Sequence, residues 1–337
     1  MEATLRWSLV TAVAPIAWGT NYFVTHELLP PGLPLYGAVL RALPAGLLLL
    51  AVRRRRPHGS WWWKSLVLGA LNTSAFFTLI YVSAQALPTS LASMIMATSP
   101  VVLMLLAWLL VAERPTVLAL AGAVIGIAGA CLMLLTAAVR VDALGVAASV
   151  GAMTLSSVGY ILAKRWSGEV DVIASTSWQL IAGSLLLIPP AVVVEGAPPA
   201  LTGDMLLGFG YVTVVATALA FAAWFTGLKH LPAASVGLIG LLNPVTGVLL
   251  GTLLAGDTLT GQQLGGIALV LAGLVLGQPV ISRFRRRAAG SRPAVLSGRS
   301  ERARPPAPPA RPAGPAAADP ACGGSGPAGG RPGSRPW

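Results

Sequence analysis

Residues 87–113 read LPTSLASMIMATSPVVLMLLAWLLVAE, and residues 231–257, which follow 144 positions later, read LPAASVGLIGLLNPVTGVLLGTLLAGD. Each stretch opens with Leu-Pro, carries a second proline directly after a polar residue, and ends with an acid. Glycines recur beyond the acid at the same spacing, with Gly122 and Gly129 matching Gly266 and Gly273. Because an internal repeat determines the architecture before any residue has a role, these stretches predict a protein of two related halves.

The composition indicates the class of protein. Of the 337 residues, 55% are hydrophobic and 10% are charged, and the mean hydropathy is +0.74. Soluble domains carry roughly 25% charged residues, so the composition predicts an integral membrane protein. The net charge is +12, but residues 283–337 hold eleven Arg against two acids and so supply +9 of it. We therefore expect the lipid bilayer as a partner and no nucleic acid.

Ten apolar stretches have the length of about 20 residues that a bilayer-spanning helix needs. They cover approximately residues 7–26, 33–52, 63–83, 89–111, 116–137, 142–163, 172–194, 205–227, 233–255 and 260–281. The sequence therefore predicts an all-α polytopic membrane protein with ten transmembrane helices, five in residues 1–138 and five in residues 139–282. Residues 283–337, rich in Pro, Ala, Gly and Arg, should form a disordered tail, because they cannot bury enough apolar surface to fold.

The distribution of Lys and Arg predicts the orientation in the membrane. With a cytoplasmic N-terminus, fourteen Lys and Arg fall in cytoplasmic segments and only Arg140 falls in an outer loop. Both termini are therefore expected in the cytoplasm, at the plasma membrane. Because five is an odd number, the second repeat is inverted relative to the first, with Glu113 at the cytoplasmic face and Asp257 at the outer face. Inverted repeats are common in secondary transporters, whose halves move about a central site.

The duplicated prolines are candidate hinges. A proline inside a spanning helix removes one backbone hydrogen bond and leaves a carbonyl without its donor. Pro100 and Pro244 alone could be packing kinks. Their duplication, with polar Ser99 and Asn243 directly before them, favours hinges or walls of a cavity instead.

Polar and aromatic side chains inside the spans are candidates for a substrate cavity, since such residues are costly in lipid and face the bundle interior. Each Ser or Thr could instead bond a carbonyl of its own helix, whereas the amides and the aromatic residues are better candidates. The candidates from this argument are Trp18, Asn21, Tyr22, Asn72, Tyr81, Ser156, Tyr160 and Trp224.

Arg41 is the one fully charged residue well inside a predicted span. Its side chain could extend to the interface, clamp backbone carbonyls, or face an anionic group of a substrate. The sequence leaves all three roles open.

Small residues predict where helices approach closely. Gly122, Gly126 and Gly129 form a GxxxG-type face, and Gly266 with Gly273 forms a weaker counterpart. Such a face packs helices within one chain or between two chains. The sequence does not separate these arrangements, so a homodimer is one of two expectations.

The ten spans in two halves, the motif Ala17-Trp18-Gly19-Thr20-Asn21, the Leu-Pro before each proline-containing helix, and the acids Glu113 and Asp257 resemble the EamA-type family of the drug/metabolite transporter superfamily. The resemblance covers residues 7–281. It implies a central cavity, alternating access, and export of a small metabolite, amino acid or drug-like compound. It also implies cavity positions for Met94, Thr98, Ser99 and Asn243, beside the candidates above.

Other functions have less support. His26, His58 and His230 lie in or beside loops, and neither HExxH nor GxSxG occurs, so we expect no enzyme, no metal site and no cofactor. A non-transporting membrane receptor or scaffold is the alternative function. It would not require the duplicated helix breaks.

Overall fold

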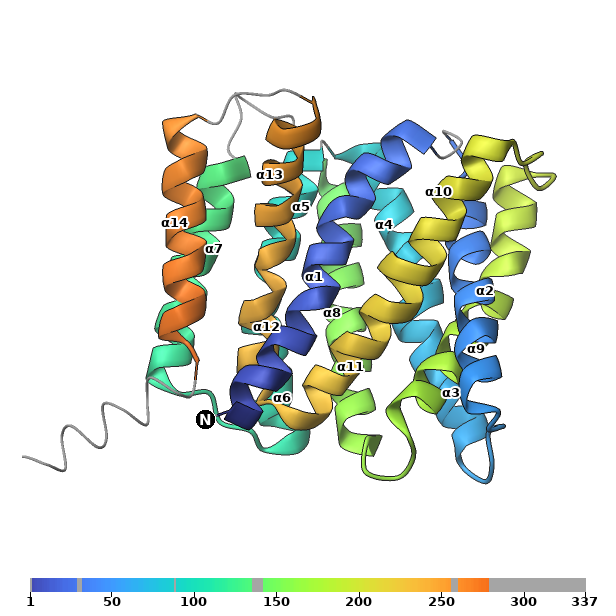
Figure 1. Ribbon diagram of the computed structural model, residues 1–337, viewed down its shortest axis with the longest axis horizontal. Coiled ribbons are helices and arrows are strands. Elements are labelled where there is room, and N and C mark those ends of the chain that lie inside the picture. The colour runs from blue at the N-terminus through green and yellow to red at the C-terminus, as the bar shows by residue number, and fades with distance from the viewer. Residues whose placement is uncertain (1, 29–31, 88, 135–141, 256–259, 279–337) are drawn as a thin grey trace, which may run out of the picture. The chain divides into compact units, whose positions relative to one another are not determined.

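The computed structural model describes residues 2–28, 32–87, 89–134, 142–255 and 260–278 (Figure 1). The described residues form fourteen α-helices and two π-helices, with no strand among them, so the predicted all-α class is confirmed. In chain order the elements are α1 (Glu2–Leu28), α2 (Pro34–Arg53), α3 (Trp61–Gly69), η1 (Ala70–Ser74), α4 (Ala75–Ala86), α5 (Thr89–Ala97), α6 (Ser99–Val111), α7 (Val117–Leu134), α8 (Ala143–Trp166), α9 (Val172–Glu195), α10 (Gly203–Thr213), η2 (Val214–Leu219), α11 (Ala220–His230), α12 (Ala233–Gly240), α13 (Leu242–Ala255) and α14 (Gly261–Leu276). The predicted disordered tail and Asp257 lie outside the described residues.

Eight helical stretches of the described chain are long and apolar enough to cross a membrane. They are Pro34–Arg53, Trp61–Ser83, Leu91–Val111, Val117–Leu134, Ala143–Trp166, Val172–Glu195, Gly203–His230 and Ala233–Leu250. The helix α14 is apolar but has 16 residues, and α1 has 27 residues but is not among the eight. The chain is therefore a polytopic helical membrane protein.

Irregular backbone recurs at the repeat spacing. The π-helices η1 and η2 begin at Ala70 and Val214, which are 144 positions apart by the numbering. The proline-containing stretches are each split into two helices, at Thr98 between α5 and α6 and at Leu241 between α12 and α13. The sequence predicted breaks around the prolines, and the structure has them just before each proline. Pro100 therefore lies in the first turn of α6, where a backbone N–H would have no helical partner.

The predicted glycine faces pack α7 against α14 within one chain. A Cβ added to Gly122 would lie 2.5 Å from the carbonyl oxygen of Gly273, and one added to Gly129 would lie 2.6 Å from that of Gly266. The pairing of early with late glycines shows that the two helices run antiparallel. The face is thus used inside the chain, and a homodimer stays a prediction.

A second close helix pair lies on the other side of the bundle. The helix α2 packs along α9, where a Cβ on Gly46 would lie 3.0 Å from the carbonyl oxygen of Ser177. Figure 1 shows the α2–α9 pair and the α7–α14 pair at opposite sides, with α1, α8, α11 and the two split helices between them. These central elements position the cavity.

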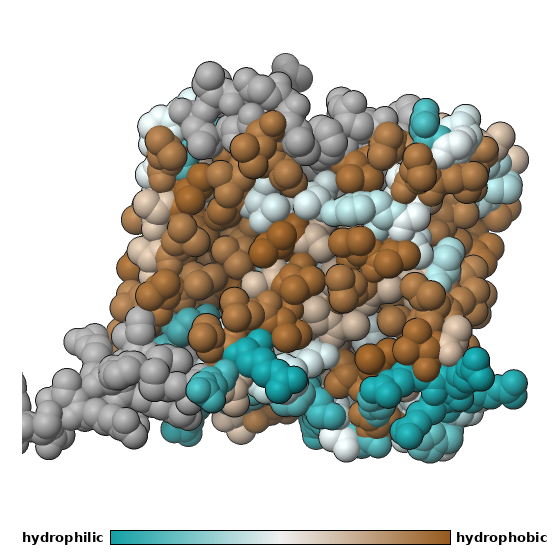
Figure 2. All heavy atoms as spheres, in the orientation of Figure 1, coloured by the Kyte–Doolittle hydropathy of each residue, from teal (hydrophilic) through white to brown (hydrophobic). Residues whose placement is uncertain are grey.

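Ion pairs gather at one end of the bundle. Arg53 pairs with Asp171 at 3.0 Å, Lys164 pairs with Glu113 at 2.9 Å, and Lys64 pairs with Glu169. Figure 2 shows hydrophilic residues concentrated at this end, below a wide apolar belt. We call it the basic end, and the opposite one the far end.

Candidate substrate cavity

A cavity of about 600 Å³ lies between the two outer helix pairs. This volume is in the range of small-molecule sites, roughly 300–1,000 Å³. Both halves of the chain supply its walls, through α1, α2, α4 to α8 and α11 to α14. The predicted candidates that line it are Trp18, Arg41, Ser99, Ser156, Tyr160, Trp224, Asn243 and Pro244.

The cavity extends from the middle of the bundle toward the far end. Leu134, the last residue of α7, and Gln263, in the first turn of α14, line it where these helices reach the far end (Figure 1). Toward the basic end its lining stops at Leu103, Tyr160 and Trp224, each more than one turn before its helical stretch ends. The described conformation is therefore closed toward the basic end.

Aromatic rings form the floor of the cavity on that side. The ring centroids of Trp18 and Trp224 are 5.2 Å apart, and Trp18 lies edge-on to Phe221 at 5.4 Å. Tyr160 packs edge-on to Trp224 at 5.5 Å and to Phe225 at 5.8 Å. Such offset and edge-on pairs stabilise each other by about 0.5–1.5 kcal/mol beyond their burial. The floor joins α1, α8 and α11.

Arg41 reaches the π-helix η2 from the cavity wall. Its Nε donates to Thr217 Oγ1 at 2.8 Å, and its Nη2 donates to the carbonyl oxygen of Ala216 at 3.0 Å. Trp18 Nε1 donates to the same carbonyl at 3.1 Å. A π-helical turn disturbs the regular α-helical ladder, and such turns recur at functional sites. Arg41 thus clamps backbone at η2, one of the roles that the sequence left open, while it also lines the cavity.

Asn72 lies in η1 and does not line the cavity. Its Nδ2 donates to Gln179 Oε1 of α9 at 2.9 Å, and its side chain is 1% exposed. Gly159 of α8 lies directly against its Oδ1. Asn72, which the sequence favoured as a ligand, therefore bonds a buried amide of another helix instead.

The remaining candidates also lie outside the lining. Tyr81 packs against the cluster around Leu35 and Leu187, and Thr98 donates to the carbonyl oxygen of Ile95 at 2.7 Å. Pro100 packs against Gly237, and Met94 is partly buried in α5. The side chains of Asn21 and Tyr22 lie outside the part of the chain that the structure describes.

Residues that the sequence reasoning passed over complete the walls. Phe76, Phe77 and Phe221 add apolar rings, and the guanidinium of Arg41 lies 5.7 Å from the ring of Phe77. Gly237 and Gly240, on the second split helix, line the cavity without side chains of their own. The sequence could have indicated this part of the cavity, because these two glycines lie close together on one of the duplicated helices.

Two polar atoms of lining residues have no hydrogen-bond partner among the described residues. They are Trp224 Nε1 and Asn243 Oδ1, and both are covered in this conformation. An unpaired buried donor or acceptor costs roughly 1–3 kcal/mol. The wall of the cavity therefore holds one donor and one acceptor that the described residues leave unpaired in this conformation.

A second hollow, of about 500 Å³, lies at the basic end. Its lining includes the paired side chains of Glu113 and Lys164, together with Arg114, Lys229 and His230. The aromatic floor lies between the cavity and this ion pair of the basic end.

Comparison with known proteins identifies related sequences. The profile described as the EamA-like transporter family matches residues 5–135 and again residues 143–277, once in each half. Protein PecM of Dickeya dadantii (strain 3937) is 34% identical over 276 residues, which cover 81% of this chain and 92% of PecM. The uncharacterized transporter YvbV of Bacillus subtilis (strain 168) is 26% identical over 277 residues, which cover 80% of this chain and 91% of YvbV.

A solved crystal structure shares the fold. It aligns with a TM-score of 0.73 at 19% identity, over 83% of this chain and 98% of that chain. Its similarity concerns the arrangement of helices alone.

Proposed function

The chain belongs to the EamA-like transporter family, and from that premise we propose that it is a secondary transporter that exports a small organic molecule by alternating access. In this proposal the chain crosses the plasma membrane ten times, as two five-helix repeats of opposite direction with both termini in the cytoplasm. The observation that carries the proposal is a cavity that both halves line and whose lining stops short of the basic end.

The repeat supports alternating access. The split helices α5–α6 and α12–α13 both line the cavity, and η1 and η2 recur at the spacing of 144 residues. Transporters built from repeats place their sites between discontinuous helices and expose them by moving one half against the other. The antiparallel packing of α7 on α14, the last helix of each half, supports the inverted arrangement.

The charge distribution supports the direction. Cytoplasmic segments carry the excess of Lys and Arg, so the basic end is assigned to the cytoplasm. The cavity extends away from that end toward the far end, which is the side on which an exporter releases its substrate. The mixture of aromatic rings, hydroxyls and an amide along the walls suits a small metabolite, an amino acid or a drug-like compound.

Metabolite release tests the proposal. In cells that overproduce the protein, we expect at least one small compound to accumulate in the medium. The variant Ser99→Phe, which places a ring in the cavity, should lower this accumulation at least tenfold, whereas Leu105→Phe on the same helix, half-exposed at the bundle surface, should leave it unchanged. The same amounts of released compounds in the media of cells with the parent protein, with Ser99→Phe or without the protein would favour the receptor or scaffold alternative.

A further inference from the structure

We propose that Glu113 and Lys164 form the cytoplasmic gate of the transport path. This inference rests on the proposed transport function and adds the residues that hold its basic end shut. The two side chains come from the ends of α6 and α8, one from each half of the chain.

Lys164 binds the end of α11. Its Nζ donates to the carbonyl oxygens of Leu228 at 2.9 Å and Leu231 at 2.6 Å, while it pairs with Glu113 Oε1 at 2.9 Å. The last carbonyls of a helix have no intrahelical donor, and a cation there is also favoured by the helix dipole. A single ammonium group therefore caps α11 and holds the carboxylate.

Glu113 binds the start of α12. Its Oε2 accepts a hydrogen bond at 2.9 Å from the backbone N–H of Ala233, the first residue of that helix. The preceding residue, Ala112, has a φ of 57°, a left-handed conformation that turns the chain sharply where α6 ends. An anion at a helix N-terminus pairs with an unsatisfied donor and with the helix dipole.

The pair therefore fastens four helix ends together. Leu231 and Pro232 join α11 to α12, and this link lies between the two caps. Lys164 is one turn beyond Tyr160 on α8, so the gate lies directly next to the aromatic floor. To open the cavity toward the basic end, α6 and α8 must separate from the α11–α12 link, and these bonds must break.

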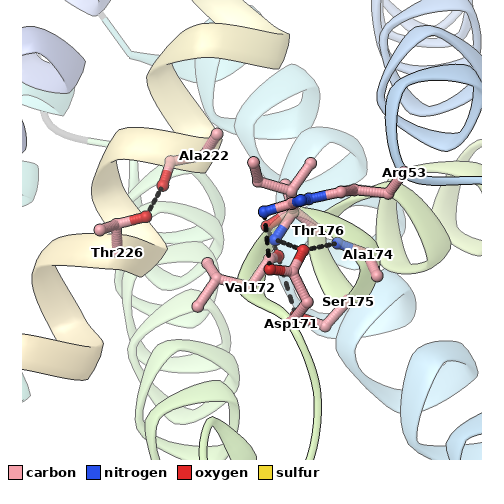
Figure 3. A network of polar contacts seen from close by, with 9 residues as sticks. Arg53, Asp171, Val172, Ala174, Ser175, Thr176, Ala222 and Thr226 are labelled. Carbon is pink, nitrogen blue, oxygen red and sulfur yellow. Dashed lines mark hydrogen bonds and ion pairs between the residues drawn. The ribbon is translucent and has the colours of Figure 1, made fainter. Parts of the chain in front are cut away.

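The other two ion pairs at the basic end of the described chain lie elsewhere. Arg53 and Asp171 join α2 to the start of α9, where Asp171 also accepts from the N–H of Ala174 (Figure 3). Lys64 and Glu169 join α3 to the link before α9. None of these four residues lines the cavity or the basic hollow. Arg53 and Asp171 therefore provide a control ion pair at the same end of the bundle and outside the gate.

Cysteine labelling tests the gate. We would replace Cys131 and Cys322 by Ala, introduce Ser99→Cys in the cavity, and apply a membrane-impermeant maleimide to each side of membrane vesicles. With Glu113 and Lys164 intact, the introduced cysteine should react with reagent added at the far end, and only slowly with reagent added at the basic end. Lys164→Met and Glu113→Gln should each raise the labelling rate from the basic end on the order of tenfold, the range of coupling for such conformational shifts. Arg53→Met and Asp171→Asn should leave the labelling rate from the basic end unchanged.

A charge swap distinguishes the caps from a simple ion pair. Glu113→Lys combined with Lys164→Glu restores opposite charges but places a cation at the start of α12 and an anion at the end of α11. We therefore expect the swapped protein to label from the basic end like the single variants. Slow labelling of the swapped protein from the basic end, as with the original pair, would overturn the capping role.

Equal labelling in the gate variants and their controls would overturn the gate. If Lys164→Met fails to insert, the nearly isosteric Glu113→Gln still decides the question. Because labelling requires no substrate movement, a negative result leaves the metabolite test of transport unaffected. If no compound is released but the gate variants label faster from the basic end, the gate is supported and the export function is not.

Discussion

Gly159 of α8 packs directly on the side-chain oxygen of Asn72, the residue that ties the π-helix η1 to Gln179 of α9. This contact places three helices around one buried amide, beside the cavity but not in it. The hydrogen bond to Gln179 satisfies Asn72 Nδ2, whereas Asn72 Oδ1 has no partner among the described residues.

Asn72→Ala should destabilise the protein. The change leaves the amide of Gln179 buried without the donor that it has now, which costs roughly 1–3 kcal/mol in general and about 0.6 kcal/mol on average for bonds between transmembrane helices. We expect a loss of about 1 kcal/mol, measured by unfolding in mixed detergent micelles. Thr78→Ala, which removes a bond inside one helix to Ser74, is the control and should cost less. Equal losses would show that the bond between helices adds nothing.

Gly159→Ala should be more harmful than Gly151→Ala on the same helix. A Cβ at position 159 would collide with the amide of Asn72, whereas one at position 151 would lie 3.3 Å from the flexible end of Leu79. Overpacking costs roughly 1–3 kcal/mol. The double variant Asn72→Ala with Gly159→Ala should lose less stability than the sum of the single losses, because the collision is gone. Additive losses would contradict the contact.

Gly129→Ala should weaken the packing of α7 on α14. Its new Cβ would meet backbone, the carbonyl oxygen of Gly266, which cannot turn aside. We expect a loss of about 2 kcal/mol. Gly210→Ala should cause no loss, because its Cβ would meet nothing within 4 Å and alanine is the better helix former. Thermal unfolding of the two purified variants measures the difference. A similar melting temperature for both would rule out a tight contact.

Arg41 variants distinguish a clamp on η2 from a charge for the substrate. Arg41→Lys keeps the positive charge but loses the planar fork that donates both to Thr217 and to Ala216. If the clamp is the main role, Arg41→Lys and Arg41→Met should lower export similarly, by about tenfold, which is 1.4 kcal/mol. Near-normal export by Arg41→Lys alone would favour the substrate role. Release of the exported compound into the medium measures both variants.

Pro100→Ala and Pro244→Ala should leave the protein inserted and lower its transport. Each proline lies in the first turn of the helix that follows a break, and alanine supplies the N–H that lets one helix continue across the break. A continuous helix would remove the break that now shapes the wall of the cavity. Export is the readout, with the amount of membrane-inserted protein as the control. Normal export by both variants would assign the prolines to packing alone.

The helical class and the approximate extent of the helices followed from the sequence by itself. Length and apolar composition suffice for them, because backbone groups in lipid must be satisfied within each helix, whatever the neighbouring helices are. The duplicated proline stretches likewise predicted irregular helices in both halves, and the structure has breaks beside Pro100 and Pro244. The π-helices were not predicted, since no single residue type marks them.

The direction of each side chain depended on the tertiary structure. Asn72 was a candidate as a buried amide and Asn243 as the polar residue before a duplicated proline, yet Asn243 lines the cavity and Asn72 bonds Gln179 between helices. A helix can rotate about its axis until its small residues meet their partners, and that rotation selects which polar groups face the centre. The sequence marked Glu113 as the acid that ends a repeated stretch and placed Lys164 among the cytoplasmic positive charges, but it predicted no contact between them. Their pairing across 51 positions (164 − 113) required α6, α8 and the α11–α12 link to converge, which packing alone brings about.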